Sequence, residues 1–380
     1  MALNRLWLVA PLIALAAIVA YLLLGRPLAD LTASAPPVEE LTVDSVRLTP
    51  GEIALTLSAD GSEPLTVAQV QVDGAWRAFT AEPSATIGRF GSALFRIPYP
   101  WIEGEAHHIV FLTSTGATFD HTIEVAVPQP EWRATAWSEL LLVGILLGIV
   151  PVALGLMSYP ALRTLGPAGV RFMLALTIGL LLFLLIDTLG EGLEQAEATL
   201  DRLHGGTAVW VAAALTTLVL LAAGRRRGAP AGARLAFFIA LGIGLHNLGE
   251  GLVVGAALTA GAAALATFLV VGFVIHNVSE GIGIAAPLAA GERASTATLA
   301  GLAALAGLPA IAGVFLGTAA VSPYWTAIAF GVGAGAIAQV IIEVALFVAR
   351  RDGVETLAGP VGAGGIVAGL VVMYATALLV

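Results

Sequence analysis

Residues 235–257 read LAFFIALGIGLHNLGEGLVVGAA, an apolar run that three polar side chains interrupt near its middle. The run is 23 residues long and holds a single charged residue, Glu250. A helix needs about 20 predominantly apolar residues to cross the hydrocarbon core of a bilayer. The segment is therefore predicted to span a membrane as a helix, because a helix satisfies its own backbone groups where no water is present.

Seven further apolar runs of similar length follow residue 136, and all eight together predict an all-α polytopic membrane domain over residues 136–380. Charged residues make up 11% of the chain and the mean hydropathy is +0.93, which excludes an ordinary soluble enzyme, a disordered chain and a coiled coil. The expected spans are about 137–158, 170–190, 207–223, 235–257, 263–288, 297–320, 325–349 and 359–380.

The N-terminal residues 1–28 contain another apolar run, LWLVAPLIALAAIVAYLLL at 6–24. Its 19 residues exceed the apolar core of about 7–15 residues that signal peptides carry. We expect an uncleaved transmembrane anchor helix, and a signal peptide cleaved near residues 33–35 is the alternative.

Residues 30–132 differ in character, because polar and apolar side chains alternate there between turn signals such as Asp73-Gly74. Alternation of period two at this spacing predicts a small β-sandwich. His107 and His108 would point to opposite faces of a strand, so they cannot form one simple site. The expected strands are 52–58, 65–72, 76–80, 93–97, 108–113 and 119–127.

Charge is distributed unevenly, and it predicts the orientation of the chain. Residues 30–135 hold 14 acids and 5 Arg, whereas the rest of the chain holds 12 of each. The acidic overall balance argues against a nucleic-acid partner, whose phosphates need a basic surface. Loops that alternate along the chain are rich in Arg, which marks the cytoplasmic side and places the β-sandwich outside the cytoplasm. These loops carry Arg163, Arg171, Arg225, Arg226, Arg227, Arg234, Arg293, Arg350 and Arg351.

The motif His-Asn-x-x-Glu-Gly occurs twice, at residues 246–251 and 30 residues later at 276–281. At about 100° per residue, the three polar side chains of each motif share one face of their helix. An ionised Glu at the membrane centre costs about 2.5–3.5 kcal/mol, so Glu250 and Glu280 need partners. Hydrogen bonds that only fix helix packing are one explanation. Because two matching motifs lie at mid-depth on consecutive helices, we favour a bound divalent cation, which uses carboxylate oxygen and imidazole nitrogen directly.

The paired motifs resemble the fourth and fifth transmembrane helices of the ZIP (Zrt-, Irt-like) family of divalent-metal transporters. The similarity is greatest over residues 275–287, IHNVSEGIGIAAP, and it extends over 136–380 but not over the anchor or the β-domain. The resemblance implies an eight-helix ZIP-like bundle with both ends outside. It also implies that the metal ligands are His246, Asn247, Glu250, His276, Asn277 and Glu280.

This sequence departs from the family pattern in two ways. Gly249 and Ser279 stand where the family motif has Pro, so a kink there would come from a Gly-weakened helix. Leu308 precedes Pro309, at a place where many members carry a further acidic ligand. We therefore expect a single metal site rather than a two-metal centre.

Two more groups of polar residues lie near the ends of predicted spans. Asp187, Glu191 and Glu194 share a face if their helix continues past residue 190, and they would then concentrate cations along an access path at the outer mouth. A solvated helix face is the alternative. Gln339 and Glu343 are four residues apart and share a face, which suits either an exit path or a carboxylate partner for Arg350 or Arg351.

We expect a transporter rather than an enzyme, and a divalent transition metal as its cargo. Nitrogen and oxygen ligands suit zinc, iron, manganese or cobalt, and cadmium is a further candidate. The resemblance implies zinc as the first candidate and import to the cytoplasm as the direction. It also implies a homodimer, since the family often forms dimers. We expect the chain in a bacterial-type inner or plasma membrane. The alternatives are an intramembrane metal-dependent hydrolase, although no H-E-x-x-H motif is present, and a membrane-anchored metal sensor. The lipid bilayer is a further expected partner of the chain, and the sequence names no partner for the β-domain.

Overall fold

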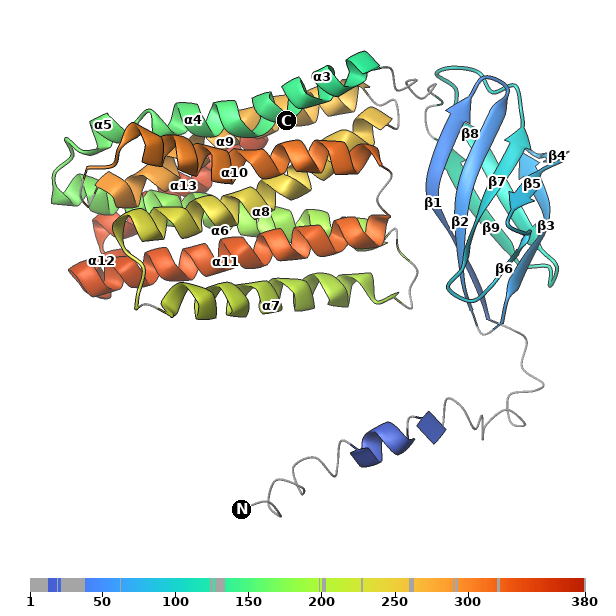
Figure 1. Cartoon of the computed structure of the whole chain (residues 1–380), viewed down its shortest axis with the longest axis horizontal. Helices are drawn as coiled ribbons and strands as arrows, with labels where there is room; N and C mark the ends of the chain where they lie inside the picture. The colour runs from blue at the N-terminus through green and yellow to red at the C-terminus, as the bar shows by residue number, and fades with distance from the viewer. Residues whose placement is uncertain are drawn as a thin grey trace.

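The computed structural model is mostly helical, with a β-rich region that precedes a bundle of long helices (Figure 1). The predicted anchor at 1–28 is described at residues 13–18 and 20–21, which are helical and exposed, and the rest of it lies outside the described residues. The structure describes residues 13–18, 20–21, 38–61, 63–123, 126, 134–197, 199, 203–226, 228–259, 263–289, 291, 293–319 and 322–378.

Within these residues, eight helical spans are long and apolar enough to cross a membrane, which confirms the prediction and indicates an integral membrane protein. The first span combines α3 (Ala134–Gly144), the π-helix η1 (Ile145–Ile149), α4 (Val150–Leu156) and α5 (Tyr159–Leu162). The others are α6 (Pro167–Glu197), α7 (Gly205–Arg225), α8 (Gly232–Thr259), α9 (Ala263–Ala289), α10 (Thr296–Thr318), α11 (Pro323–Asp352) and α13 (Pro360–Ala377), with the short α12 (Glu355–Ala358) before the last.

Glycine contacts divide these helices into two groups. In the first group, α4 packs on α9 and α8 packs on α10 so closely that a Cβ at Gly155 or Gly251 would collide with the backbone of Val278 or Ala310. In the second group, α13 packs on α6 and α11 packs on α7 in the same way, with Gly369 against the backbone of Leu176. Small residues allow helix backbones to approach in lipid, so each group is a tightly packed unit.

Contacts between the two groups are made largely through side chains. An added Cβ at Gly249 of α8 would first meet the ring of Phe330 at 3.0 Å, and one at Gly283 of α9 would meet Thr177 Cγ2 at 3.1 Å. Gly333 of α11 does face backbone, with the Cα of His246 at 3.1 Å. At these glycines the backbones of the two groups therefore lie farther apart than the backbones at the glycine contacts within each group.

The β-rich region forms two antiparallel sheets that share one apolar core, as a β-sandwich does. Phe95 and Phe111 meet in this core with ring centres 6.4 Å apart. One sheet has the order β1-β2-β7-β5, and the other has the order β4-β3-β8-β9 with β6 beside β3. The strands are β1 (Glu39–Thr49), β2 (Glu52–Gly61), β3 (Leu65–Val72), β4 (Ala75–Arg77), β5 (Thr80–Glu82), β6 (Thr86–Ile87), β7 (Ser92–Pro98), β8 (His107–Thr113) and β9 (Thr118–Ile123).

Strand β1 was not among the predicted strands, and its pairing explains why. The apolar side chains of β1 fall at odd positions in its first half, at Leu41 and Val43, and at even positions in its second half, at Val46 and Leu48. The register of β1 against β2 shifts between Val43 and Ser45. A β-bulge of this kind adds one residue and breaks the period of two on which the prediction rests.

The two neighbouring histidines of β8 lie on opposite faces, as predicted, since His107 is buried and His108 is exposed. The Asp73 carboxylate accepts hydrogen bonds from Tyr99 Oη at 2.7 Å, from His107 Nδ1 at 2.8 Å and from the His108 backbone N–H at 2.8 Å. Partial burial opposes ionisation, but these hydrogen bonds outweigh it and lower the pKa of Asp73 to about 2. Because His107 Nε2 also accepts from the backbone N–H of Ile102 at 3.3 Å, the cluster is structural.

Candidate metal centre

The two polar motifs meet where α8 packs against α9 in the interior of the bundle. The ring centres of His246 and His276 lie 6.4 Å apart. Five of the six polar side chains are buried, and the His276 side chain is 12% exposed. The six are His246, Asn247 and Glu250 on α8, with His276, Asn277 and Glu280 on α9.

The Glu250 carboxylate lies between the two imidazoles. Its Oε1 atom is 2.5 Å from His276 Nε2 and 3.1 Å from His246 Nε2. Its Oε2 atom accepts a hydrogen bond from Asn277 Nδ2 at 3.1 Å. Glu250 therefore joins both helices through one carboxylate.

Acceptor atoms outnumber donors in this buried space. Four oxygen atoms have no hydrogen-bond partner among the described residues: the Oδ1 atoms of Asn247 and Asn277, and both carboxylate oxygens of Glu280. Leaving a buried acceptor unsatisfied costs about 1–3 kcal/mol, and more for a charged group. A set of converging acceptors without donors is the environment that a cation needs.

Three ligand atoms already converge in this space. One atom from each of His246, His276 and Glu280 lies within 4.8 Å of the other two. Atoms that share a zinc ion at about 2.0–2.2 Å are at most about 4.4 Å apart. Small side-chain shifts would therefore bring these three atoms onto one ion, with the Glu250 carboxylate beside them.

Backbone carbonyls orient the two amide side chains. Asn277 Nδ2 donates to the carbonyl oxygen of Leu147 at 3.0 Å, and Asn247 Nδ2 donates to that of Ala306 at 3.1 Å. Leu147 lies in the π-helix η1, four residues before Pro151. Because proline has no N–H, the α-helical partner of the Leu147 carbonyl is missing, and the Asn277 amide takes its place.

The predicted access path runs along α6 toward this cluster. The helix continues to Glu197 instead of ending near residue 190, so Asp187, Glu191 and Glu194 do lie on one helix. Asp187 and Glu194 are exposed and Glu191 is half-buried. Asp187 interacts electrostatically with both His246 and His276, which brings the innermost acid of the stripe near the cluster.

The predicted exit residues lie elsewhere on α11 and are engaged differently. Glu343 is fully buried and accepts a hydrogen bond from Arg225 Nε at 2.7 Å, and its other oxygen is 3.8 Å from Arg350 Nη2. This geometry matches the ion-pair alternative for Glu343. Gln339 is also fully buried, and neither its amide nitrogen nor its amide oxygen has a hydrogen-bond partner among the described residues.

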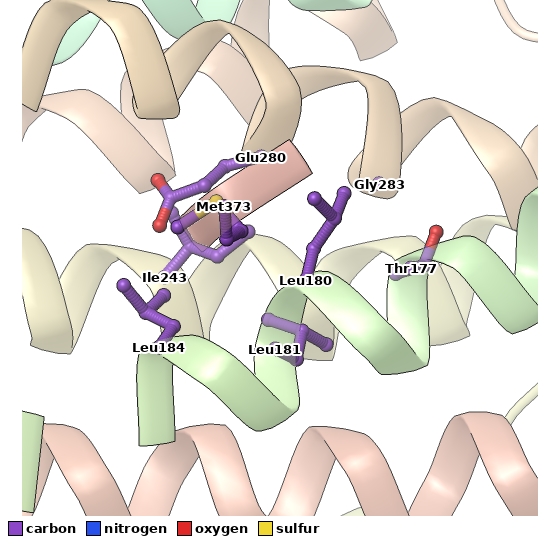
Figure 2. A pocket seen from close by; sticks show the side chains of 8 residues that line it. All are labelled: Thr177, Leu180, Leu181, Leu184, Ile243, Glu280, Gly283 and Met373. Carbon is purple, nitrogen blue, oxygen red and sulfur yellow. The ribbon is translucent and has the colours of Figure 1, made fainter. Parts of the chain in front are cut away.

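A small cavity continues from Glu280 toward the C-terminal end of α9 (Figure 2). Its volume of about 10 Å³ is close to the minimum that one water molecule requires. Apart from Glu280 and Thr177 its walls are apolar, and the Thr177 hydroxyl donates to the Met173 carbonyl at 2.9 Å. The lining residues are Thr177, Leu180, Leu181, Leu184, Ile243, Glu280, Gly283 and Met373.

No protein-family model matches this chain, and no curated protein matches it either. The resemblance to the ZIP family therefore rests on the two motifs and on the number of helices.

The site includes partners that the sequence analysis missed. The Leu147 carbonyl and the Thr188 hydroxyl both contact motif side chains, and neither belongs to a motif. Pro151 inside an apolar span was a signal that a carbonyl one turn earlier is free. Leu308, where the family carries an acid, is 52% exposed and is therefore not a partner of this buried cluster.

Proposed function

We propose that this chain is a membrane transporter of the ZIP type that moves a divalent transition-metal ion into the cytoplasm, with zinc as the first candidate substrate. The observation that carries the proposal is the group of unpaired acceptors between α8 and α9. Two carboxylates, two imidazoles and two amide oxygens lie together there, and four of their oxygens have no donor in the part of the chain that the structure describes. A divalent cation satisfies such a set, whereas hydrogen bonds that only fix packing would leave no acceptor without a donor.

The proposed direction of transport follows from charge. The Arg-rich loops define the cytoplasmic side by the positive-inside rule, so the β-sandwich and the outer end of α6 face the opposite compartment. Asp187 is exposed ten residues before that end of α6, and it interacts electrostatically with the two imidazoles. On the cytoplasmic side of Glu280, the described cavity walls are apolar apart from Thr177, whose hydroxyl donates to the Met173 carbonyl. We infer that the site is reached from outside in this conformation and is closed toward the cytoplasm.

The two packed groups of helices suit movement of one against the other. The resemblance implies that α3–α5, α8, α9 and α10 move as one body against α6, α7, α11 and α13. Backbone-to-backbone glycine contacts hold each group together, and side chains such as Phe330 and Thr177 separate the groups. Sliding at the interface between the groups would carry both ligand-bearing helices together, so the ion would move with its site.

The test is metal uptake into proteoliposomes with zinc, iron(II), manganese and cadmium. Wild type is compared with Glu250→Ala and Glu280→Ala, and with Glu139→Ala as a control at an exposed acid on α3. We expect uptake of at least one metal by wild type and by the control, and loss of uptake in both site variants. Equal uptake by all four proteins would overturn the proposal.

A further inference from the structure

Thr188 of α6 lies opposite His246 of α8, and both side chains are buried. The Thr188 hydroxyl oxygen is 2.6 Å from the Leu184 carbonyl oxygen and 2.9 Å from His246 Nδ1. A hydroxyl has one hydrogen to donate, and a carbonyl oxygen can only accept. When the Thr188 hydrogen is directed to Leu184, the hydroxyl accepts from His246, and Nδ1 must carry the hydrogen.

The other ring nitrogen of His246 then faces the candidate metal centre. Its Nε2 atom lies 3.1 Å from Glu250 Oε1, and His246 has a ligand atom within 4.8 Å of those of His276 and Glu280. A metal binds the imidazole nitrogen that carries no hydrogen, and the bond made by the opposite nitrogen decides which one that is.

We propose that Thr188 is a positioning residue for the cation site. Its hydroxyl holds the His246 ring with Nδ1 protonated and presents Nε2 to the ion. This inference rests on the proposed function for the identity of the ion, but the position of the proton belongs to the metal-free protein. Nothing in the motifs assigns this role, since Thr188 lies 58 residues before His246 on another helix.

The same hydrogen bond joins the two packed groups of helices. Thr188 belongs to the α6 group and His246 to the α8 group. The ring is therefore held in its binding orientation only while α6 and α8 are in contact. When the groups slide apart, His246 loses its partner and the site loses affinity, which favours release of the ion at the end of the movement.

The experiment uses the full chain in lipid nanodiscs with ¹⁵N-labelled histidine, and a His246→Gln variant assigns the His246 signals. Magic-angle-spinning NMR of the metal-free protein reads which ring nitrogen is protonated. Equilibrium titration with zinc and cadmium reads affinity. The variants are Thr188→Val, which removes the hydroxyl, and Thr188→Ser, which keeps it. Thr326→Val is the matched control, because Thr326 on α11 is also buried and donates to the carbonyl four residues earlier, yet has no histidine partner among the described residues.

In wild type we expect a protonated, hydrogen-bonded Nδ1 on His246 and a change at Nε2 when metal is added. Thr188→Val should lose the Nδ1 signature and bind metal about 10-fold more weakly, within the 10–100-fold range known for such outer partners. Thr188→Ser should restore both readouts, and Thr326→Val should match wild type.

An unprotonated Nδ1 in wild type would overturn the inference, and so would a Thr188→Val protein that matches Thr326→Val in both readouts. A wild type with the expected Nδ1 signal that binds neither metal would refute the proposed function instead, because the proton position is measured without metal.

Discussion

Glu250 and His276 join α8 to α9 through a contact of 2.5 Å between Oε1 and Nε2. Glu280 lies at the same helix pair, yet neither of its carboxylate oxygens has a hydrogen-bond partner among the described residues. Two acids of one repeated motif are therefore in opposite situations. Glu250 accepts hydrogen bonds within the protein, whereas Glu280 accepts none that meets the same geometry from the described residues.

This difference predicts opposite effects of one substitution on the metal-free protein. Glu280→Met removes an unpaired buried carboxylate, so we expect stability to rise by about 1–3 kcal/mol. Glu250→Met leaves His276 and Asn277 without the carboxylate that both contact, so we expect stability to fall by a similar amount. Thermal unfolding in detergent without metal measures both. Added zinc should raise the unfolding temperature of wild type and of neither variant, and a Glu280→Met protein less stable than wild type would contradict this account.

Close packing of α4 on α9 should be sensitive to a single methyl group. A Cβ at Gly281 would collide with the backbone of Val152, so Gly281→Ala must push α9 away from α4. We expect a loss of about 1–3 kcal/mol in stability and weaker metal binding, because α9 carries His276 and Glu280. Gly301→Ala on α10 is the control, since a Cβ there has no neighbour within 4 Å. It should be neutral or stabilising by up to about 1 kcal/mol, and equal unfolding temperatures for the two variants would argue against the packing.

Asp187 should act on the approach of the ion rather than on its binding geometry. Asp187→Asn removes one charge near the two imidazoles, so at low salt we expect the half-saturating metal concentration for uptake to rise by about tenfold. Near 0.15 M salt the effect should shrink, because charges are then screened over about 8 Å. Glu139→Gln removes an exposed acid from α3 and should change neither value. A salt-independent effect of Asp187→Asn would indicate a direct ligand instead.

The β-sandwich should lose stability in strong acid through Asp73. Its folded-state pKa of about 2 is below the ordinary value of 3.8, so ionised Asp73 favours the folded state. That contribution is complete above about pH 4 and is lost as the pH falls toward 2. Hydrogen exchange of β3 and β8 amides in the full chain should therefore accelerate over this range. Asp73→Asn keeps a residue type that tolerates the positive φ of 53° and should exchange faster at neutral pH with a flatter acid dependence. Identical pH profiles for the two proteins would exclude this role.

Most of the architecture could be predicted because apolar period and length are local properties. The eight spans follow from runs such as 235–257, whose composition leaves a membrane helix as the simple solution. The failures occurred where the local period is interrupted. A bulge after Val43 concealed β1, and α6 continued past the last apolar residues because its exposed acids are compatible with a helix.

The candidate site was predictable in its residue types but not in its connections. Spacing within each motif places His, Asn and Glu on one helix face. Spacing does not show that Glu250 contacts both imidazoles while Glu280 forms no hydrogen bond with either, since those contacts depend on the distance between α8 and α9. Nor could spacing show that Arg225, on another helix, forms an ion pair with Glu343, which was predicted to lie on an exit path.

By itself, the sequence determined that this chain has helices suited to a membrane and carries two matched sets of His, Asn and Glu side chains, because hydrophobic length and helical period act within one segment. Only the tertiary structure decided which acid is left unpaired, that a proline-freed carbonyl at Leu147 holds Asn277, and that Thr188 meets His246. These relationships join residues on different helices, so they exist only after glycine contacts have set how closely the backbones approach.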